Sequence, residues 1–288
     1  RDLVNELPEE LWQDIEIIGW MYQFYISDRN SEVIGAQVQD ADIPAATQLF
    51  TPNWIVKFML HNRVGAQWMS TYPNSRLASQ MDYYLPPVEQ YLETALKMHA
   101  ITPDQLQPEA MTVIDPACGS GHILVEAYEL FKAIYLERGY RQRDIAKLIL
   151  EHNLFGLDID PRAGQLTGFA LMMKGRADDR RLFSRNIRLN VVRFHSSRGF
   201  EPSDIDLKDL QRVGLSVLQL NSVKLIFEEA NALGTLIRVP DTVVALLPKL
   251  KELLAHTSGN LFAAEAIHQL SYIVPQIELL ARRYDAVV

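Results

Sequence analysis

The feature that most constrains this chain is a short apolar segment that runs into a glycine-containing turn. Residues 111–114, Met-Thr-Val-Ile, favour a buried strand, and residues 115–122, Asp-Pro-Ala-Cys-Gly-Ser-Gly-His, follow as the turn. A helical run to Glu137 comes directly after it. A turn of this kind aims free backbone N–H groups and the positive end of a helix dipole at one point, which binds anionic groups. Gly119 and Gly121 allow the backbone to approach such a ligand closely.

Strands and helices alternate along the rest of the chain. We expect strands at residues 153–158 and 187–194, with a helix from Pro161 to about Lys174 between them. A long helix at 260–283 and a last strand at 284–288 end the sequence. This alternation is typical of a parallel sheet covered by helices. We therefore expect residues 101–288 to form an α/β core, with a helical insertion at about 200–258 and a stop at its fourth strand.

The first hundred residues read mostly as helix, so residues 1–100 are expected to form an N-terminal helical region. Apolar side chains recur at helical spacing from Leu11 to Tyr25, and the polar stretch from Ser27 to Asp42 is expected to end that helix. Thr51 and Pro52 are expected to open the next one, because threonine caps free N–H groups and proline suits the first helical position.

Composition narrows the class of protein. The chain has 288 residues, 48% of them hydrophobic, which suits about two globular domains or one elaborated domain. Its formal net charge of −8 gives no basic footprint of nucleic-acid binding. A single cysteine, Cys118, excludes an intrachain disulfide and a cysteine-rich zinc site, and it fits a reducing cytoplasm. No apolar run reaches the roughly 18 residues of a transmembrane helix, so no membrane partner is expected.

The glycine turn also indicates which ligand it takes. Asp115 adds a carboxylate beside the anion site, and a ligand that carries both a carboxylate and an ammonium group would satisfy both. The methionine half of S-adenosylmethionine has these two groups. A dinucleotide fingerprint requires a third glycine where Leu124 stands, and no Gly-Lys-Ser/Thr follows to make a nucleotide-triphosphate loop.

A second motif, Gly-Leu-Asp-Ile-Asp-Pro at residues 156–161, ends the next expected strand. An acidic residue at this point reads the ribose hydroxyls of a nucleoside, and Asp158 is assigned that role. Asp160 precedes a proline at a helix start, so it is interpreted as the helix cap. Ile159 would lie against the adenine ring. Two acids with no nearby histidine or third ligand do not favour a metal, and no metal is expected.

These residues resemble a known family. Residues 115–122 look like motif I of amino-group DNA methyltransferases, and residues 156–161 look like their motif II. Residues 46–56, with Phe-Thr-Pro at their centre, are similar to motif X, so the order X, I, II is that of the N6-adenine enzymes of the gamma arrangement. Residues 17–27 and 43–48 more narrowly resemble PglX-type methyltransferases of BREX phage-defence systems.

The resemblance implies a Rossmann-like, S-adenosylmethionine-dependent methyltransferase core that transfers a methyl group to N6 of adenine in double-stranded DNA. The target base would be flipped out of the duplex. Motifs and resemblance together give the expected cofactor contacts as Phe50, Thr51, Pro52, Asp115, Pro116, Ala117, Gly119, Ser120, Gly121, Asp158, Ile159 and Glu229. Glu229 is the first candidate for the family's motif III, and Asn231 is the second.

The chain departs from the family at the catalytic tetrapeptide, Asn/Asp/Ser-Pro-Pro-Tyr/Phe, which is absent. The one Pro-Pro pair, Pro86-Pro87, follows Leu85 and precedes motif I. Residues 284–288 look like the strand that delivers the tetrapeptide, so we expect it beyond Val288 of a longer parent, and we expect this chain alone to be inactive.

Alternatives remain open at this point. The parent could act on another amino or amide nitrogen, in RNA or protein, or the chain could be a non-catalytic module that binds a cofactor or a partner. Double-stranded DNA, through the parent, and other defence-system subunits are the expected partners.

Overall fold

The computed structural model describes residues 16–33, 42–88, 91–255 and 261–288. At its centre lies a sheet of four parallel strands in the order β3-β2-β1-β4, so the parallel sheet expected from the sequence is present. The strands are β1 (Val113–Asp115), β2 (Leu154–Asp158), β3 (Asn190–Arg193) and β4 (Ala286–Val287). Ile114 is in register with Phe155 on one side and with Val287 on the other.

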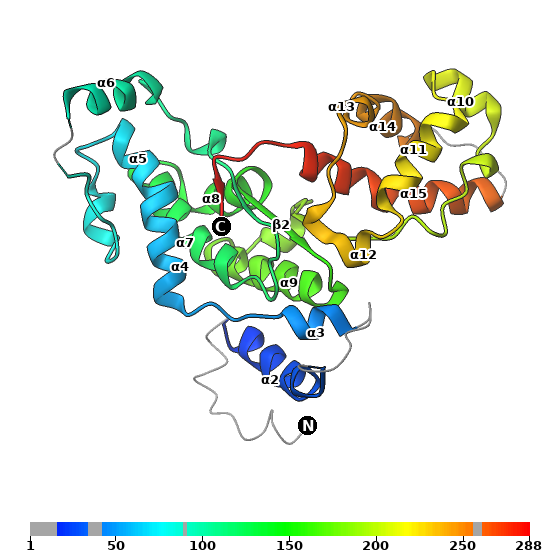
Figure 1. The fold of residues 1–288 in the computed structure, drawn as a ribbon. Coiled ribbons are helices and arrows are strands. Elements are labelled where there is room, and N and C mark those ends of the chain that lie inside the picture. The colour runs from blue at the N-terminus through cyan, green and yellow to red at the C-terminus, as the bar shows by residue number, and fades with distance from the viewer. Residues whose placement is uncertain (1–15, 34–41, 89–90, 256–260) are drawn as a thin grey trace.

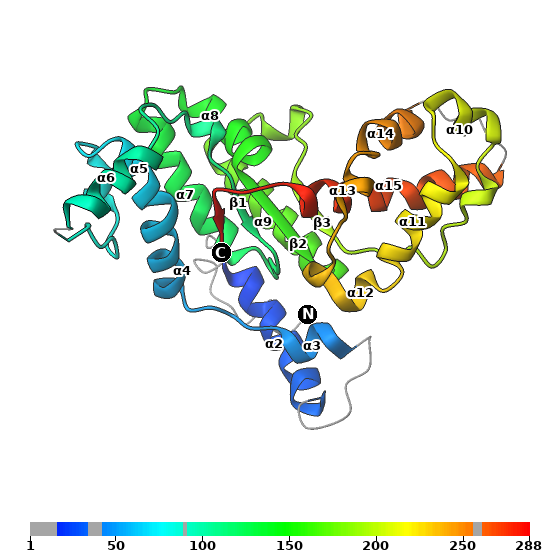
Figure 2. The ribbon, with the colours of Figure 1, turned by 45° about the horizontal axis from the view of Figure 1, so that its top comes forward.

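Helices cover both faces of this sheet (Figures 1 and 2). Alternate residues of β1 point to opposite faces, as strand geometry requires, so Val113 joins one core cluster and Ile114 the other. The Val113 face packs against α7 (His122–Glu137), α8 (Gln142–Leu148) and α9 (Pro161–Asp178). The Ile114 face packs against α15 (Leu261–Ala281) and the helices of the insertion.

The insertion forms a lobe at one side of the molecule, and α15 leads back from it toward β4 (Figure 1). Its elements are η8 (Pro202–Asp204), α10 (Leu207–Val213), α11 (Val217–Phe227), α12 (Ala230–Leu233), η9 (Gly234–Leu236), α13 (Asp241–Val244) and α14 (Leu247–Ala255). A capping box between Ser216 and Gln219 starts α11.

The N-terminal part is helical, as expected. It comprises α2 (Glu16–Val33), α3 (Ile43–Thr47), α4 (Asn53–Leu60), η3 (His61–Gly65), α5 (Ala66–Thr71), η4 (Arg76–Gln80) and α6 (Leu92–Ile101), and η5 (Pro108–Ala110) leads into β1. Short η6 (Ile149–Asn153) and η7 (Leu182–Ser184) occur within the core. In the views of Figures 1 and 2, α4 lies beside α7, while α2 and α3 lie together below the sheet.

Two predicted boundaries in this part were wrong. Helix α2 does not end at Ser27 but continues to Val33. The Ser27 and Ser31 hydroxyls bond to the carbonyl oxygens of Phe24 and Ser27, so these polar side chains are satisfied inside the helix. The expected helical residues from Leu11 to Ile15 lie outside the described residues.

The start of α4 is the second difference. The helix begins at Asn53, and Pro52 stands at the cap position in an extended conformation. The carbonyl oxygen of Pro52 accepts hydrogen bonds from the N–H groups of Ile55, at 2.9 Å, and Val56, at 3.2 Å. Thr51 therefore lies one residue too early to cap the helix.

Among the described residues, no single helix is long and apolar enough to cross a membrane. One pair of segments would be long and apolar enough only if taken together, Val217–Leu236 and Asp241–Ala255, and the chain bends by 112° between them.

Candidate cofactor site

A cavity of about 240 Å³ lies at the carboxyl ends of β1, β2 and β3. In open parallel sheets, ligands bind at this edge, near the point where the strand order reverses. The lining residues come from the turn after β1, the ends of β2 and β3, the start of α9, α2, α3 and the α12–η9 segment. They are Tyr22, Ile43, Pro44, Thr47, Gln48, Pro116, Ala117, Gly119, Asp158, Ile159, Asp160, Ala163, Phe194, Ala232, Leu233, Gly234 and Thr235.

The two glycines of the turn have different roles. Gly119 has φ +54°, and a Cβ placed on it would meet no atom within 4 Å, so its backbone faces open space at the cavity. Gly121 has φ +89°, but its Cβ would lie 3.0 Å from Thr167 on α9. Gly119 therefore leaves the cavity open, while Gly121 allows α7 to pack closely on α9.

Asp115 lies beneath this turn at the end of β1 and is 3% exposed. Its carboxylate accepts a hydrogen bond of 3.1 Å from the N–H of Ala117. Burial raises the pKa of Asp115 to about 7, and the nearby Asp158 carboxylate adds to the rise. A cationic group in the cavity would favour the ionised form of this side chain.

Asp158 ties the turn to the end of β2. One carboxylate oxygen accepts a bond of 2.7 Å from the N–H of Gly119, and the other accepts one of 2.7 Å from the N–H of Asp160. Burial raises the pKa of Asp158, and these backbone donors oppose the rise. Each oxygen keeps a further lone pair, so the side chain can still accept hydrogen bonds from a ligand.

Asp160 caps α9, as predicted. Its side chain accepts a bond of 2.8 Å from the N–H of Arg162, and Pro161 occupies the first helical position. The second oxygen of the carboxylate accepts a hydrogen bond from the Tyr22 hydroxyl on α2. Its neighbour Ile159 lines the cavity.

The Phe-Thr-Pro centre of motif X lies next to the cavity rather than in its wall, whereas Thr47 and Gln48 of the same motif line it. Phe50 stacks on His122 at the start of α7, with ring centroids 4.6 Å apart, and Trp20 of α2 meets its edge at 6.3 Å. Phe50, Thr51 and Pro52 do not line the cavity; the preceding α3 segment does. Asp115, Ser120 and Gly121 are likewise absent from the lining, and Asp115 lies behind Pro116 and Ala117, which do line it.

Glu229 points elsewhere. It is an exposed residue whose carboxylate forms an ion pair with Arg198, and it does not line the cavity. Asn231, the second candidate for motif III, lines an adjoining groove of about 880 Å³. The nearby wall of the cavity is instead formed by residues 232–235.

Sequence reasoning missed most of the wall, including its two aromatic residues, Tyr22 and Phe194. Phe194 is 3% exposed and directly follows β3. Its position after the third parallel strand was the available signal, because that is where sheet folds of this kind place ligand contacts. Tyr22 reaches the cavity from α2, and no local pattern pointed to it.

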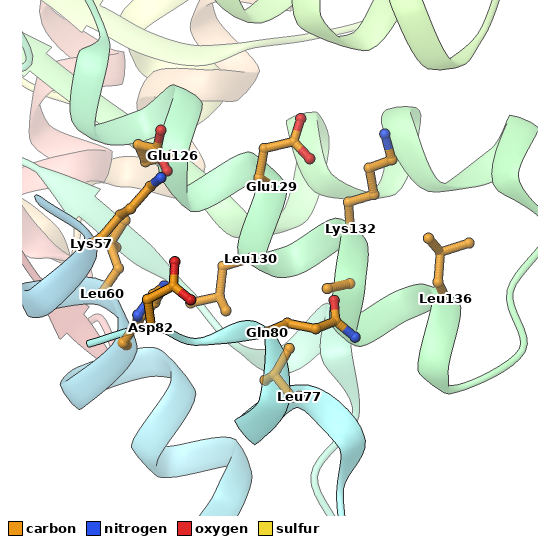
Figure 3. Close-up of a pocket in the computed structure, with 12 residues that line it drawn as sticks. Lys57, Leu60, Leu77, Gln80, Asp82, Glu126, Glu129, Leu130, Lys132 and Leu136 are labelled. Carbon is orange, nitrogen blue, oxygen red and sulfur yellow. The ribbon is translucent and has the colours of Figure 1, made fainter. Parts of the chain in front are cut away.

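A separate groove of about 380 Å³ lies between α4, η4 and α7 and shares no lining residue with the cavity (Figure 3). Two of its charged side chains already have partners. Glu129 pairs with Lys174 at 2.7 Å, and Lys132 pairs with Asp178 at 2.6 Å. Within the described part of the chain, no group of three or more His, Cys, Asp or Glu side chains could hold a metal ion.

The match to known proteins begins with the class. Residues 67–186, which contain the glycine turn and Asp158, match the family model described as N-6 DNA Methylase. The motif-based resemblance to adenine methyltransferases is therefore confirmed for this segment.

Particular relatives extend the similarity. The chain is 46% identical to the adenine-specific methyltransferase BrxX of Escherichia coli O9:H4 (strain HS). The alignment has 311 residues and covers 100% of this chain and 26% of that protein. It is 36% identical, over 225 residues, to the adenine-specific methyltransferase PglX of Lacticaseibacillus casei (strain Zhang), which covers 73% of this chain and 18% of that protein. The chain thus spans about a quarter or less of the length of these curated relatives.

Proposed function

We propose that the cavity at the carboxyl edge of the sheet binds S-adenosylmethionine. The observation that carries this proposal is the pair of buried carboxylates, Asp115 and Asp158, at the ends of adjacent strands around the open backbone of Gly119. Two buried acids are costly to ionise without a positive partner, and S-adenosylmethionine carries an ammonium and a sulfonium charge.

The residues have distinct roles in this proposal. Asp115 would hold the ammonium group, and backbone N–H groups of the glycine turn would meet the carboxylate. Asp158 would accept hydrogen bonds from the ribose hydroxyls, while Ile159 and Phe194 supply apolar contacts for adenine. The bound molecule supplies an electrophilic methyl group, and the chain's own residues bind it, orient it and shield it from water.

The reaction of the whole protein is proposed from its relatives. Both are named adenine-specific methyltransferases, and we propose that this chain is the cofactor-binding part of an enzyme that methylates N6 of adenine in DNA during phage defence. The strand order β3-β2-β1-β4 supports a Rossmann-like core at residues 101–288, with residues 1–100 as the helical region. We further propose a cytoplasmic protein that engages double-stranded DNA and other defence subunits.

Calorimetric titration tests the cofactor assignment. Asp158→Ala should weaken binding of S-adenosylmethionine more than Asp160→Ala does, because charge-assisted hydrogen bonds contribute about 1.5–3 kcal/mol. Asp160→Ala should instead lower stability by about 0.5–2 kcal/mol through loss of the helix cap. Both titrations are run well below the melting temperature of each variant. Two results would contradict the assignment. One is the absence of heat at millimolar ligand with the folded, unsubstituted 288-residue chain, and the other is weaker binding by Asp160→Ala than by Asp158→Ala.

A further inference from the structure

Helix α2 forms a wall of the cofactor cavity although it precedes all three motifs. It spans from the glycine turn to the start of α9. A Cβ on Gly19 would lie 2.6 Å from Oγ and 3.3 Å from Cβ of Ser120, so the helix backbone rests on the turn. Three residues further along, the Tyr22 hydroxyl donates to the Asp160 carboxylate. One side chain of α2 thus bonds to the motif that caps α9.

The attachment of α2 is smaller than that of the other walls. Among the described residues, its buried contacts form a separate cluster of Tyr22, Ile26, Ala45 and Ala163, apart from the two large clusters that fill the faces of the sheet. Several large apolar side chains of the helix face solvent, namely Trp20, Phe24 and Tyr25. Elements with few buried contacts open at a lower free energy than the core does.

The size of the cavity shows why opening matters. Its volume of about 240 Å³ lies below the roughly 300–1,000 Å³ of typical small-molecule sites. The groove of about 880 Å³ adjoins it and shares Pro44, Ile159, Asp160 and Phe194. Tyr22 lines the cavity, whereas Tyr25 and Ile26, on the same helix, line the groove. A displacement of α2 would therefore widen both spaces together.

We propose that α2 is a lid that opens to admit and release the cofactor, with the Tyr22–Asp160 hydrogen bond as its latch. The lid rests on the proposed function, since it acts on the same cavity. Tyr22 is a positioning residue: it acts through Asp160 and through the place of α2.

The latch keeps its donor across the physiological range. Burial raises the pKa of the Tyr22 phenol, and its hydrogen bond to Asp160 raises it further, so the hydroxyl stays protonated. The lid is therefore controlled by ligand and by movement of the helix rather than by ionisation of this tyrosine.

A reversible cross-link tests the lid. The Cβ separation of 3.3 Å between positions 19 and 120 is close to the roughly 3.5–4.5 Å of a disulfide. The double variant Gly19→Cys, Ser120→Cys, made with Cys118→Ala, is oxidised, and association and dissociation of S-adenosylhomocysteine are followed by stopped flow. Oxidation should slow both rates at least tenfold, and reduction of the same sample should restore them.

A matched pair of substitutions tests the latch. Tyr22→Phe should raise the dissociation rate of S-adenosylhomocysteine about tenfold and speed amide exchange across residues 19–33. Tyr91→Phe, at an exposed tyrosine just before α6 that lines neither the cavity nor the groove, should leave both within about twofold.

The outcomes separate the lid from the cofactor assignment. Equal rates for the oxidised and reduced protein, or equal effects of the two tyrosine variants, would overturn the lid while binding itself stands. If the unsubstituted 288-residue chain does not bind S-adenosylhomocysteine at all, the cofactor assignment fails and the lid with it.

Discussion

Asp115 is buried at the end of β1 with one backbone hydrogen bond, and its pKa of about 7 links it to the stability of the fold. In the unfolded chain an aspartate titrates near 3.9. Between these values the folded protein holds a proton that the unfolded chain has released. Stability is therefore greatest below about pH 4 for this group, and it is lost as pH rises through about 7.

Replacing Asp115 should remove this dependence. From pH 5 to pH 8 the unfolding free energy of the unsubstituted chain should fall relative to that of Asp115→Asn by a few kcal/mol at most, because one pKa unit corresponds to about 1.4 kcal/mol. Urea unfolding at the two pH values measures the difference. Asp104→Asn, at an exposed site, serves as the control. If the unfolding free energies of the unsubstituted chain and of Asp115→Asn change in parallel, Asp115 does not titrate in this range.

Whole elements show where sequence patterns succeed and fail. Helix α7 was predicted at its observed bounds, because the glycine turn before it and the apolar periodicity within it are local signals. The end of α2 was missed, because serine side chains can bond within a helix as well as end one. Glu229 was placed at the site by motif order, yet it pairs with Arg198, a contact that depends on how the insertion folds.

The junction of α7 and α9 gives a prediction about packing. Gly121→Ala should lower stability by more than Gly139→Ala, although both residues have positive φ, of +89° and +80°. Backbone strain of about 1–2 kcal/mol is common to both. Only at Gly121 does the added methyl group meet a neighbour, Thr167 at 3.0 Å. Thermal or urea unfolding compares the variants, and equal losses would mean that α9 moves away without cost.

Across the whole molecule, the parallel sheet and the two carboxylates at its edge were predictable, since each lies in a motif of adjacent residues. The part of the wall formed by Tyr22 and Gly234 was not, because these distant segments meet the end of β2 only after folding. Gly234 shows the closeness of that meeting: a Cβ on it would lie 2.9 Å from Ile159. No pattern within a single segment records such a contact.

The sequence also sets an expectation for activity of the chain as a whole. These 288 residues contain no Asn-Pro-Pro-Tyr-like tetrapeptide, so we expect no methyl transfer from tritiated S-adenosylmethionine to mixed-sequence DNA. Loss of one electrostatic contact typically costs about 10²–10³ in rate, and loss of base positioning forfeits much of the ~7–11 kcal/mol that orientation contributes. A longer chain that continues into such a tetrapeptide should label adenine. Label above background with the 288 residues alone would place the catalytic groups within them.

The buried thiol of the glycine turn can report how often the site opens, without any label being introduced. Cys118 is the single cysteine of the chain, is 4% exposed, and lies against Gly156 under the turn. Burial raises the pKa of its thiol well above the ordinary value, so an alkylating reagent reaches a reactive thiolate only when the turn lifts from β2. The rate of alkylation therefore counts openings of the site in the unmodified protein. S-adenosylmethionine should lower the rate of Cys118 alkylation in proportion to its occupancy. An alkylation rate that does not change with the ligand would mean that the turn opens with the cofactor in place.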